Sequence, residues 1–379
     1  MMDENNLKKH YSLVASQAHR QCNDAHYERA LANYQQCLLI ARQLQDDEKM
    51  AANYSWIAEC LRKLNRHDDA LLMLAPNLSK YAKGDPKEIY NSMTTYIGIA
   101  LELPAEKSLI AGAIDETRAY LVNIGRLEWE HSLMLLEAIF LEEQGLITEA
   151  LERGQQAWAI WRQQYPYFTA DSHYFQLIMV QIRLQNLENA KSLLAQWEEN
   201  QANTHPTTRM AQMYQVRSYL SRLERDYETT IRYAEQAVHF AQKLEVPRDY
   251  AQALHILAWA QILTDNFALA RQTIAKIPLI ILKKKKYSIT GDFHLMHARH
   301  LCGLPVIDPV FTARLPEISN SIDLHPALPR ELHRAGLAYQ FALNRARMID
   351  KAFGCSWRQD AIQARINHIQ ALTCSMGYS

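Results

Sequence analysis

Three histidines, His294, His297 and His300, stand at every third position of one segment. On an α-helix, residues three apart lie close on one face, so two neighbouring imidazoles could bind one metal ion. However, no Asp, Glu or Cys stands at ligand spacing to complete the set, and histidines on a helix surface are usually bystanders. The sequence therefore predicts no metal site at these histidines.

The sequence contains none of the short motifs that carry a catalytic or phosphate-binding mechanism, namely GxxxxGKS/T, GxGxxG, GxSxG and HExxH. The segment from Asp85 to Lys87 predicts a turn rather than a phosphate cradle. No nucleophile is paired with a base at a spacing that indicates catalysis. We therefore expect no enzymatic activity and no cofactor.

Charge is balanced, with 41 Lys and Arg against 41 Asp and Glu. Nucleic acids and anionic membranes are held largely by clustered basic residues. The clearest such cluster, Lys283 to Lys286, follows an apolar run from Ile277 to Leu282. This run suits the end of a buried helix, and the lysines suit a solvated loop. We therefore predict that neither nucleic acid nor membrane is a partner.

The chain opens on a polar, acidic segment, and no run approaches the ~18 apolar residues that a membrane-spanning helix needs. We therefore expect a soluble protein of the cytoplasm.

The cysteines form no CxxC pair and no spacing typical of a zinc site or a disulfide framework. We expect mostly buried, reduced thiols at Cys22, Cys37, Cys60, Cys302, Cys355 and Cys374.

One short pattern recurs along the chain: an aromatic or apolar residue, two variable residues, a small residue and usually an apolar residue. Its small residue recurs with a period of 40, at Ala30, Ala70, Ala150, Ala190, Thr230 and Ala270. One copy is missing near position 110, where Ser108 and Leu109 are a degenerate version. A second small residue lies about a dozen positions upstream, at Ala18, Ala58, Ala138, Ser218 and Ala258, and Ile178 breaks this rule.

The segments around these small residues have apolar residues at helical spacing, separated by short polar stretches. The low counts of 11 Gly and 12 Pro also favour long helices. Each unit is therefore predicted to be a helix, a tight turn and a second helix. We expect turns near positions 25, 65, 145, 185, 225 and 265, and almost no β-structure.

This pattern resembles the tetratricopeptide repeat (TPR) family, on residues such as Tyr27, Ala30, Trp56, Gly145 and Phe267. The common TPR period is 34, whereas this one is 40 and looks more like the long repeats of kinesin light chains, Rap-type peptide receptors and large bacterial regulators. The N-terminus does not resemble the three-helix bundle of Rap receptors, so their activity is not carried over. The resemblance implies an all-α fold, a right-handed TPR-like superhelical solenoid of helix-turn-helix hairpins with a divergent C-terminal helical cap.

The pattern divides the chain into two parts. Residues 1–282 are predicted to form a TPR-like array of about seven 40-residue helical hairpins, and residues 283–379 a divergent helical cap or module. In the second part, a Pro-marked loop separates an extra first helix from two closing helices, near 330–352 and 358–372. A cap that covers the last hairpin is favoured because arrays require one, and a separate effector module stays the alternative.

In this family, the first helix of each hairpin lines a concave groove. Matching positions give a binding face of Glu59, Arg62, Glu142, Arg183, Gln212, Gln215, Tyr219, Arg222, His255 and Trp259. The same positions give Ala15, His19, Cys22, Ser55, Leu135, Ile139, Glu143, Phe175, Met179, Ile182 and Ile262. Amides can bind a peptide backbone, and Arg, Tyr and Trp are common anchors. An alternative is that Phe175, Met179, Ile182 and Trp259 are core residues.

Two hypotheses follow for function. The first is a non-enzymatic scaffold or receptor that binds a protein or peptide ligand in the concave groove. The second is a regulatory subunit that acts allosterically on an enzyme or on transcription machinery through its convex face or C-terminal helices. An apolar patch on the helices between Arg330 and Leu372 would favour the second. Self-association into a homo-oligomer stays open.

Overall fold

The computed structural model describes residues 3–24, 26–79, 85–103, 105–164, 171–201, 209–243, 247–277, 283–301, 306, 327–353 and 357–375. Within these ranges the regular structure consists of 17 α-helices and one short 3-10 helix, with no strand. Two compact units divide the chain, Met1–Met210 with Gln242–Pro247, and Ala211–Ala241 with Arg248–Ser379. The predicted all-α fold class is confirmed.

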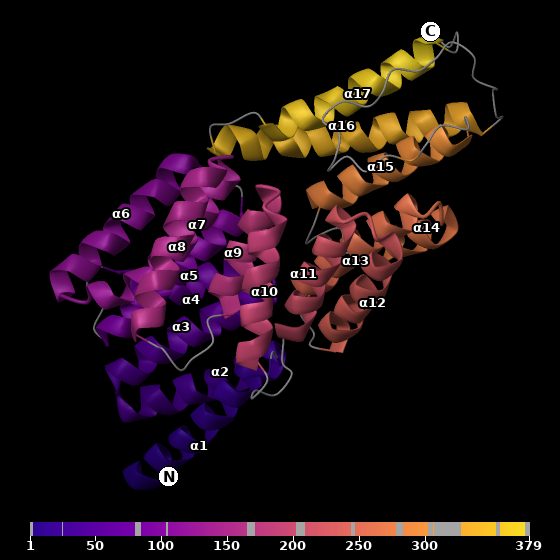
Figure 1. Ribbon diagram of the computed structural model, residues 1–379. Helices are drawn as coiled ribbons and strands as arrows, with labels where there is room; N and C mark the ends of the chain where they lie inside the picture. Colours follow the sequence, from indigo (N-terminus) through magenta and orange to yellow (C-terminus); the bar gives the residue numbers. More distant parts are fainter. Residues whose placement is uncertain are drawn as a thin grey trace. The chain divides into compact units, whose positions relative to one another are not determined.

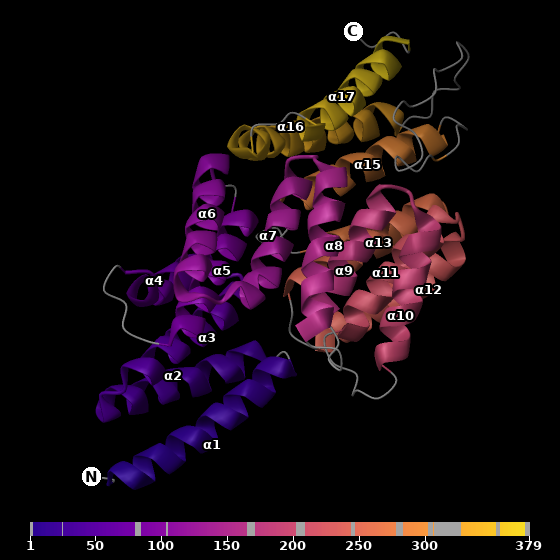
Figure 2. The ribbon, with the colours of Figure 1, turned by 60° about the vertical axis from the view of Figure 1, so that its left-hand side comes forward.

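The first unit holds five helical hairpins (Figure 1). Their helices are α1 (Glu4–Asn23), α2 (Tyr27–Leu44), α3 (Asp47–Lys63), α4 (His67–Leu78), α5 (Pro86–Glu102), α6 (Lys107–Ile124), α7 (Glu130–Glu143), α8 (Ile147–Gln164), α9 (Asp171–Arg183) and α10 (Leu187–Gln201), with a 3-10 turn at Leu127–Trp129. Each second helix also packs on the next first helix, as α2 does on α3 (Figure 2).

The second unit continues the pattern and then departs from it. Its helices are α11 (Arg209–Leu223), α12 (Tyr227–Lys243), α13 (Pro247–Leu263), α14 (Phe267–Lys276), α15 (Lys283–Leu301), α16 (Leu328–Phe353) and α17 (Trp357–Ser375). The lysines from Lys283 to Lys286 are part of α15, so the expected solvated loop is wrong there. The Pro-marked loop lies outside the described residues, apart from Val306.

The hairpin turns occur where the period predicts them, and six of them share one hydrogen bond. The backbone N–H that follows each turn donates to the carbonyl five residues back, at 2.8–3.0 Å. The donors are His26, Arg66, Leu146, Asn186, Asp226 and Asn266. This bond closes a helix C-terminus when the residue before the donor has a left-handed conformation. Positive φ angles recur accordingly at Asn65, Gly145, Gln185, Arg225 and Asp265.

The first residues of α5 differ from expectation. Asp85 does not sit in a free turn, because its side chain accepts a hydrogen bond from the backbone N–H of Lys87 at 2.9 Å and caps α5. Pro86 is the first residue of that helix, where the missing N–H of proline carries no penalty. The segment from Asp85 to Lys87 therefore begins a helix.

The small residues of the period are buried where helices approach closely. All six of them, from Ala30 to Ala270, are at most 1% exposed. The missing copy is a hairpin as well, formed by α5 and α6, with Ile110 at the expected position and 0% exposed. Gly98 supplies a small residue at the upstream position of this hairpin, so the period runs through it without a gap.

The last three helices enclose a polar contact in an apolar core. Asp292 of α15 accepts hydrogen bonds from the hydroxyl of Tyr339 on α16, at 2.6 Å, and from the guanidinium of Arg365 on α17, at 3.0 Å. A Cβ on Gly291 would lie 2.7 Å from the ring of Tyr339, so only glycine allows the ring to approach. The three helices lie side by side in Figure 1.

The packing predicts the effect of enlarging one small residue. Ala150→Leu should overpack the contact between α7 and α8 and lower the free energy of unfolding by about 1–3 kcal/mol. Ala159→Leu, on an exposed position of the same helix α8, is the matched control and should change it little. Chemical denaturation measures both, and an equal effect of the two changes would contradict the assigned faces.

Replacing two glycines by alanine, one in a hairpin turn and one inside a helix, should change stability in opposite directions. Gly145 has a φ of 84°, so Gly145→Ala should destabilise the chain by about 1 kcal/mol. Gly112 lies exposed within α6 with open space around it, so Gly112→Ala should stabilise by about 0.5–1 kcal/mol. Thermal unfolding monitored by circular dichroism tests the two signs, and two changes of the same sign would count against this turn geometry.

Candidate ligand-binding face

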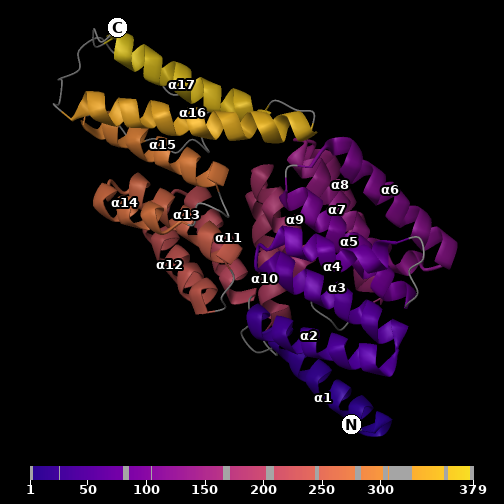
Figure 3. The ribbon, with the colours of Figure 1, turned by 180° about the vertical axis from the view of Figure 1, so that it is seen from behind.

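First helices follow one another through the first unit. Helix α3 packs against α5, α5 against α7, and α7 against α9, as Figure 3 lets the reader follow for α3, α5 and α7. The face that these helices form is the one to which the sequence assigned ligand binding. We call it the first-helix face, and its predicted residues in this unit are Glu59, Arg62, Glu142 and Arg183.

Arg62 is the centre of an ion network at the C-terminal ends of α3 and α5. Its guanidinium lies 2.7 Å from one carboxylate oxygen of Glu59 and 2.5 Å from Glu102. The second oxygen of Glu102 lies 2.8 Å from the imidazole of His67 on α4. The side chains of Arg62 and Glu102 are each 16% exposed, so the network is largely buried. One arginine therefore connects two consecutive first helices.

The pKa values of this network indicate a stable ion pair. Burial alone would raise the pKa of Glu59, but the positive charges of Arg62 and Lys63 outweigh it and hold that pKa below its usual value. Burial likewise opposes the charge of Arg62, while the carboxylates of Glu59 and Glu102 raise its pKa. These groups stay charged because each has a partner.

A second contact of the same kind connects α7 to α9. The guanidinium of Arg183 lies 2.7 Å from Glu142, whose other oxygen accepts a hydrogen bond from the amide of Gln176. Glu142 is only 9% exposed, whereas Arg183 is 41% exposed. Arg183 therefore presents part of a charged group to solvent while its partner is buried.

Apolar side chains on α7 and α9 lie near these charged groups in sequence. Leu135 and Ile139 of α7, and Phe175 and Met179 of α9, are neither fully buried nor exposed. Ile182 is 8% exposed and belongs to the core, as the alternative interpretation allowed. The first-helix face therefore combines half-buried apolar side chains with paired charges.

In the second unit, the structure brings together two of the predicted residues. The guanidinium of Arg222 on α11 lies 4.8 Å from the ring centroid of Trp259 on α13. Both residues are buried, at 4% and 3% exposed, so this cation–π contact is part of the helix packing. Gln215 is 1% exposed and donates to the backbone oxygen of Asp249 at 3.0 Å.

The other predicted residues of this unit keep more exposed surface. Gln212 and His255 are partly exposed, and Tyr219 packs against Ile256 and Leu257 while it is partly exposed itself. Arg222 and Trp259 are therefore poor candidates for direct ligand contact, whereas Gln212, Tyr219 and His255 have atoms that a ligand could reach.

Sequence reasoning missed Glu102, His67 and Gln176, which complete the networks of the first unit. Glu102 had a usable signal, because it stands 40 residues after Arg62 at the same position of the repeat. Gln176 had none, because its role depends on how α9 approaches α7.

The histidines on α15 also have a partner from a distant segment. His294 lies 2.5 Å from a carboxylate oxygen of Glu331 on α16, and His297 lies 3.3 Å from the same oxygen without hydrogen-bond geometry. Among the described side chains, no group of three or more His, Cys, Asp or Glu residues is arranged to hold a metal ion.

Among the helices of the described residues, none combines the length and apolar character needed to cross a bilayer.

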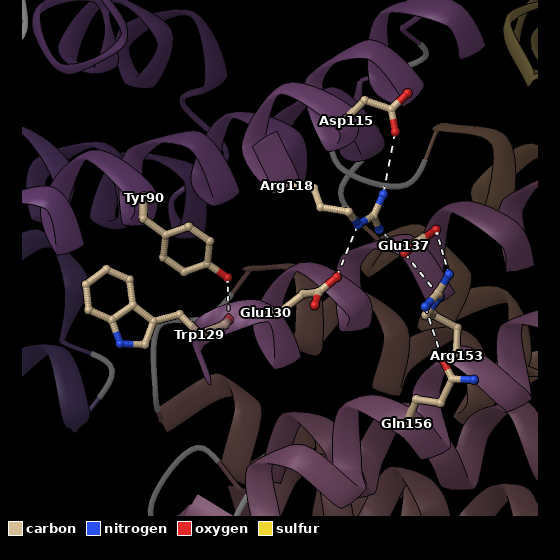
Figure 4. Close-up of polar contacts among 8 residues, drawn as sticks. All are labelled: Tyr90, Asp115, Arg118, Trp129, Glu130, Glu137, Arg153 and Gln156. Carbon is tan, nitrogen blue, oxygen red and sulfur yellow. Dashed lines mark hydrogen bonds and ion pairs between the residues drawn. The ribbon is translucent and has the colours of Figure 1, made fainter. Parts of the chain in front are cut away.

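A further ion network lies among α6, α7 and α8 (Figure 4). Arg118 of α6 and Arg153 of α8 both pair with Glu137 of α7, at 2.7 and 3.1 Å. Arg118 also pairs with Glu130, the residue that precedes His131. This network fixes the start of α7 against its neighbours.

Comparison with known proteins supports the fold. No protein-family model matches the chain, and no curated protein matches it. The chain is similar to the crystal structure of a Rap protein complexed with competence and sporulation factor, with 11% identity, a TM-score of 0.57, and coverage of 98% of this chain and 100% of that one. A tetratricopeptide repeat protein from Parabacteroides merdae aligns over 95% of this chain and 98% of that one at 12% identity. Its TM-score of 0.36 is too low to support a conclusion about the fold. The chain therefore has a TPR-like helical-repeat fold.

The environment of His131 predicts a pH dependence of stability. Burial lowers the pKa of His131 from 6.5 to about 4. As the pH falls below 6.5, the His131 ring binds a proton in the unfolded chain but stays neutral in the folded chain. Stability is therefore lost between pH 6.5 and about 4. His131→Gln should remove this part of the loss, roughly 1 kcal/mol at pH 5 once partial solvation is allowed for.

Thermal unfolding between pH 7 and pH 4.5 measures the effect. The matched control is His333→Gln, which changes an exposed histidine on α16. The His131 variant should lose less stability than the wild type on acidification, and the His333 variant should follow the wild type. Parallel curves for all three proteins would show that His131 is not buried as described.

Proposed function

We propose that this protein is a non-enzymatic scaffold that binds a peptide, or a segment of a partner protein, on its first-helix face. The observation that carries the proposal is the pair of ion contacts, Arg62 with Glu102 and Arg183 with Glu142, each of which connects consecutive first helices. The half-buried apolar residues of α7 and α9 lie on the same two helices as Glu142 and Arg183. Side chains held in this way are arranged before a ligand arrives, which lowers the entropy cost of binding.

The chemistry of this face suits an extended peptide. Arg183 has exposed surface beyond its contact with Glu142, and guanidinium groups bind carboxylates and carbonyl oxygens in a fixed geometry. Phe175 and Met179 offer partly exposed apolar surface on the same helix. A ligand with one acidic and one apolar side chain fits this combination.

The Rap protein lends support at the level of the fold. Its crystal structure contains competence and sporulation factor, and it shares a helical-repeat fold with this chain. Helical-repeat folds of this kind expose long surfaces formed by successive repeats, which suit extended ligands. The proposed site in this chain rests on its own residues in the first unit: Glu59, Arg62, Glu142 and Arg183.

For residues 283–379, we propose the role of a cap. One apolar core of the second unit includes Ala258 and Phe267 from the last repeat together with Phe293, Tyr339 and Ile362 from the closing helices. An array needs such a cover over the apolar face of its last hairpin. This continuous core favours the cap over a separate module.

A specific observation supports regulation through the C-terminal helices as the second candidate. Leu337 and Phe341 lie four residues apart on α16 and are 51% and 56% exposed. Positions four apart share a helix face, so these side chains form a small apolar patch within the segment where the sequence analysis sought one.

Peptide selection followed by mutagenesis tests the proposal. A random linear peptide library is selected against the full chain, and the affinity of the selected peptide is measured by calorimetry. Arg183→Ala and Phe175→Ala should each weaken binding more than tenfold, or about 1.4 kcal/mol, because they remove contacts at the centre of the face.

The matched control is Arg66→Ala. Arg66 has similar exposure, 48% for the side chain, but pairs with Asp69 near the turn between α3 and α4. Binding to this variant should stay within about twofold, because a solvent-exposed ion pair contributes little. Binding that survives Arg183→Ala and Phe175→Ala but is lost in Leu337→Ser would favour the second candidate instead.

A further inference from the structure

The outer face of α16 combines apolar and basic side chains. Leu337 and Phe341, which are 51% and 56% exposed, are its large apolar residues. After Pro329, the other exposed side chains described on this helix are polar or basic: Arg330, His333, Gln340, Asn344, Arg347 and Lys351. At the period of an α-helix, these residues together cover about 120° of the circumference. We call this stripe the outer face of α16.

No acidic residue of α16 contributes to this outer face. Glu331 and Asp350, the acidic residues of the helix, are 4% and 0% exposed. Glu331 lies 2.5 Å from His294 and 3.3 Å from Arg334. Asp350 accepts a hydrogen bond from the backbone N–H of Gln359 at 2.9 Å. Both carboxylates are therefore used inside the second unit, and the outer face carries a net positive charge.

Helix α17 shows that this combination is not a general property of the closing helices. Its exposed side chains, among those described, are small or polar: Asp360, Ala361, Ala364, Asn367, Gln370 and Ala371. Its half-buried Arg365 is paired with the buried Asp292 at 3.0 Å. Large exposed apolar side chains and exposed basic side chains therefore occur together on α16 and not on the described part of α17.

The large apolar side chains on the other sides of α16 pack inward. Leu332, Tyr339 and Leu343 belong to the apolar core that joins the closing helices to the last repeat. Leu337 and Phe341 lie outside that core and keep more than half of their surface exposed. The apolar part of the outer face is therefore a narrow stripe rather than a broad surface.

A narrow stripe of this form suits a second helix better than a lipid bilayer. A helix that lies on a membrane buries a broad apolar face among the lipids. In the seam between two packed helices, apolar residues three or four apart are bordered by charged positions that repeat every seven residues. His333, Gln340 and Arg347 stand at this seven-residue spacing beside Leu337 and Phe341. The border of the stripe therefore includes the permanent positive charge of Arg347.

We propose that the outer face of α16 binds an amphipathic helix of a partner protein, and that the polar border of this partner helix is acidic. Apolar residues of the partner pack on Leu337 and Phe341, and its carboxylates pair with Arg330, Arg347 and Lys351. Like charges across an interface are unfavourable, so a basic helix is selected against. With 26 residues, α16 is about 39 Å long, which gives a partner helix of several turns a continuous surface.

This inference rests on the second candidate function, regulation through the C-terminal helices, and names the class of partner that this function requires. It does not depend on the first-helix face, because none of its residues belongs to that face.

Selection from a charge-balanced helical peptide library tests the proposal. Each varied position of the displayed peptides is Ala, Leu, Glu or Lys with equal frequency, so acidic and basic sequences start equally common. The full chain is the bait, and peptides are retained when they bind the wild type but not the double variant Leu337→Ser/Phe341→Ser. We expect the retained peptides to carry a net negative charge and Leu residues three or four apart.

Variants then separate the apolar and the charged parts of the face, with the affinity for one retained peptide measured by fluorescence anisotropy. Leu337→Ser and Phe341→Ser should each weaken binding about tenfold or more, because they remove the apolar contact. The double charge reversal Arg347→Glu/Lys351→Glu should weaken it about fivefold or more. Added salt should reduce the effect of the reversal, because it screens exposed charges.

Two matched controls come from the first unit. Leu13→Ser changes an apolar side chain of α1 that is 68% exposed, and Arg162→Glu reverses an exposed charge on α8. Both variants should bind the peptide within about twofold of the wild type, because neither residue is part of the outer face of α16. Circular dichroism verifies that each variant is folded.

Retained peptides that are neutral or basic would overturn the acidic partner while the second candidate function stays in place. If no peptide distinguishes the wild type from the double variant, the second candidate function fails as well. Two other occupants are measured directly, a second copy of the chain by sedimentation velocity and a phosphatidylserine-containing vesicle by flotation. Self-association or vesicle binding that Phe341→Ser abolishes would assign the face to that occupant and overturn the proposal.

Discussion

One backbone hydrogen bond, which closes six of the hairpin turns, determines much of this structure. It runs from the residue after the turn to the carbonyl five residues back, and it recurs in six hairpins at 2.8–3.0 Å. Because it ends six of the first helices at the same position of the repeat, residues just before these turns stand in equivalent places in their hairpins. Arg62 and Glu102 stand 40 residues apart, at the same position of the repeat near the ends of α3 and α5, and there they meet. The regular period thus places residues that are distant in sequence next to each other.

Charged groups at these positions are mostly enclosed by the fold. Arg62 and Glu102 lose most of their hydration, and the ion pair between them offsets that loss. A buried pair of this kind adds little net stability, because the cost of desolvation is similar to the gain from the ion pair. Arg183 differs because 41% of its side chain stays exposed. This difference in exposure, rather than in residue type, separates a residue that joins two helices from one that can also contact a ligand.

Sequence periodicity predicted the helical class and the turns, because Ala30, Ala70 and Ala150 are small for a steric reason that leaves a mark in the sequence. It failed at position 110, where Ile110 replaces the small residue, although Gly98 keeps the period upstream. The burial of Trp259 agrees with the alternative that it is a core residue, whereas the burial of Arg222 against it was not predicted. Helical spacing tells which side chains share a face, whereas burial depends on how closely the next hairpin approaches.

The carboxylate of Asp292 has a consequence for how the last three helices are aligned. Its partners Tyr339 and Arg365 come from two different helices, and Gly291 beside it leaves room for the tyrosine ring. An apolar core alone tolerates a helix that slides by one turn, because one aliphatic side chain replaces another. Sliding α16 or α17 would strand a charge away from water, which is costly. The polar contact therefore allows only one register of α15, α16 and α17, whereas their apolar surfaces alone would allow several.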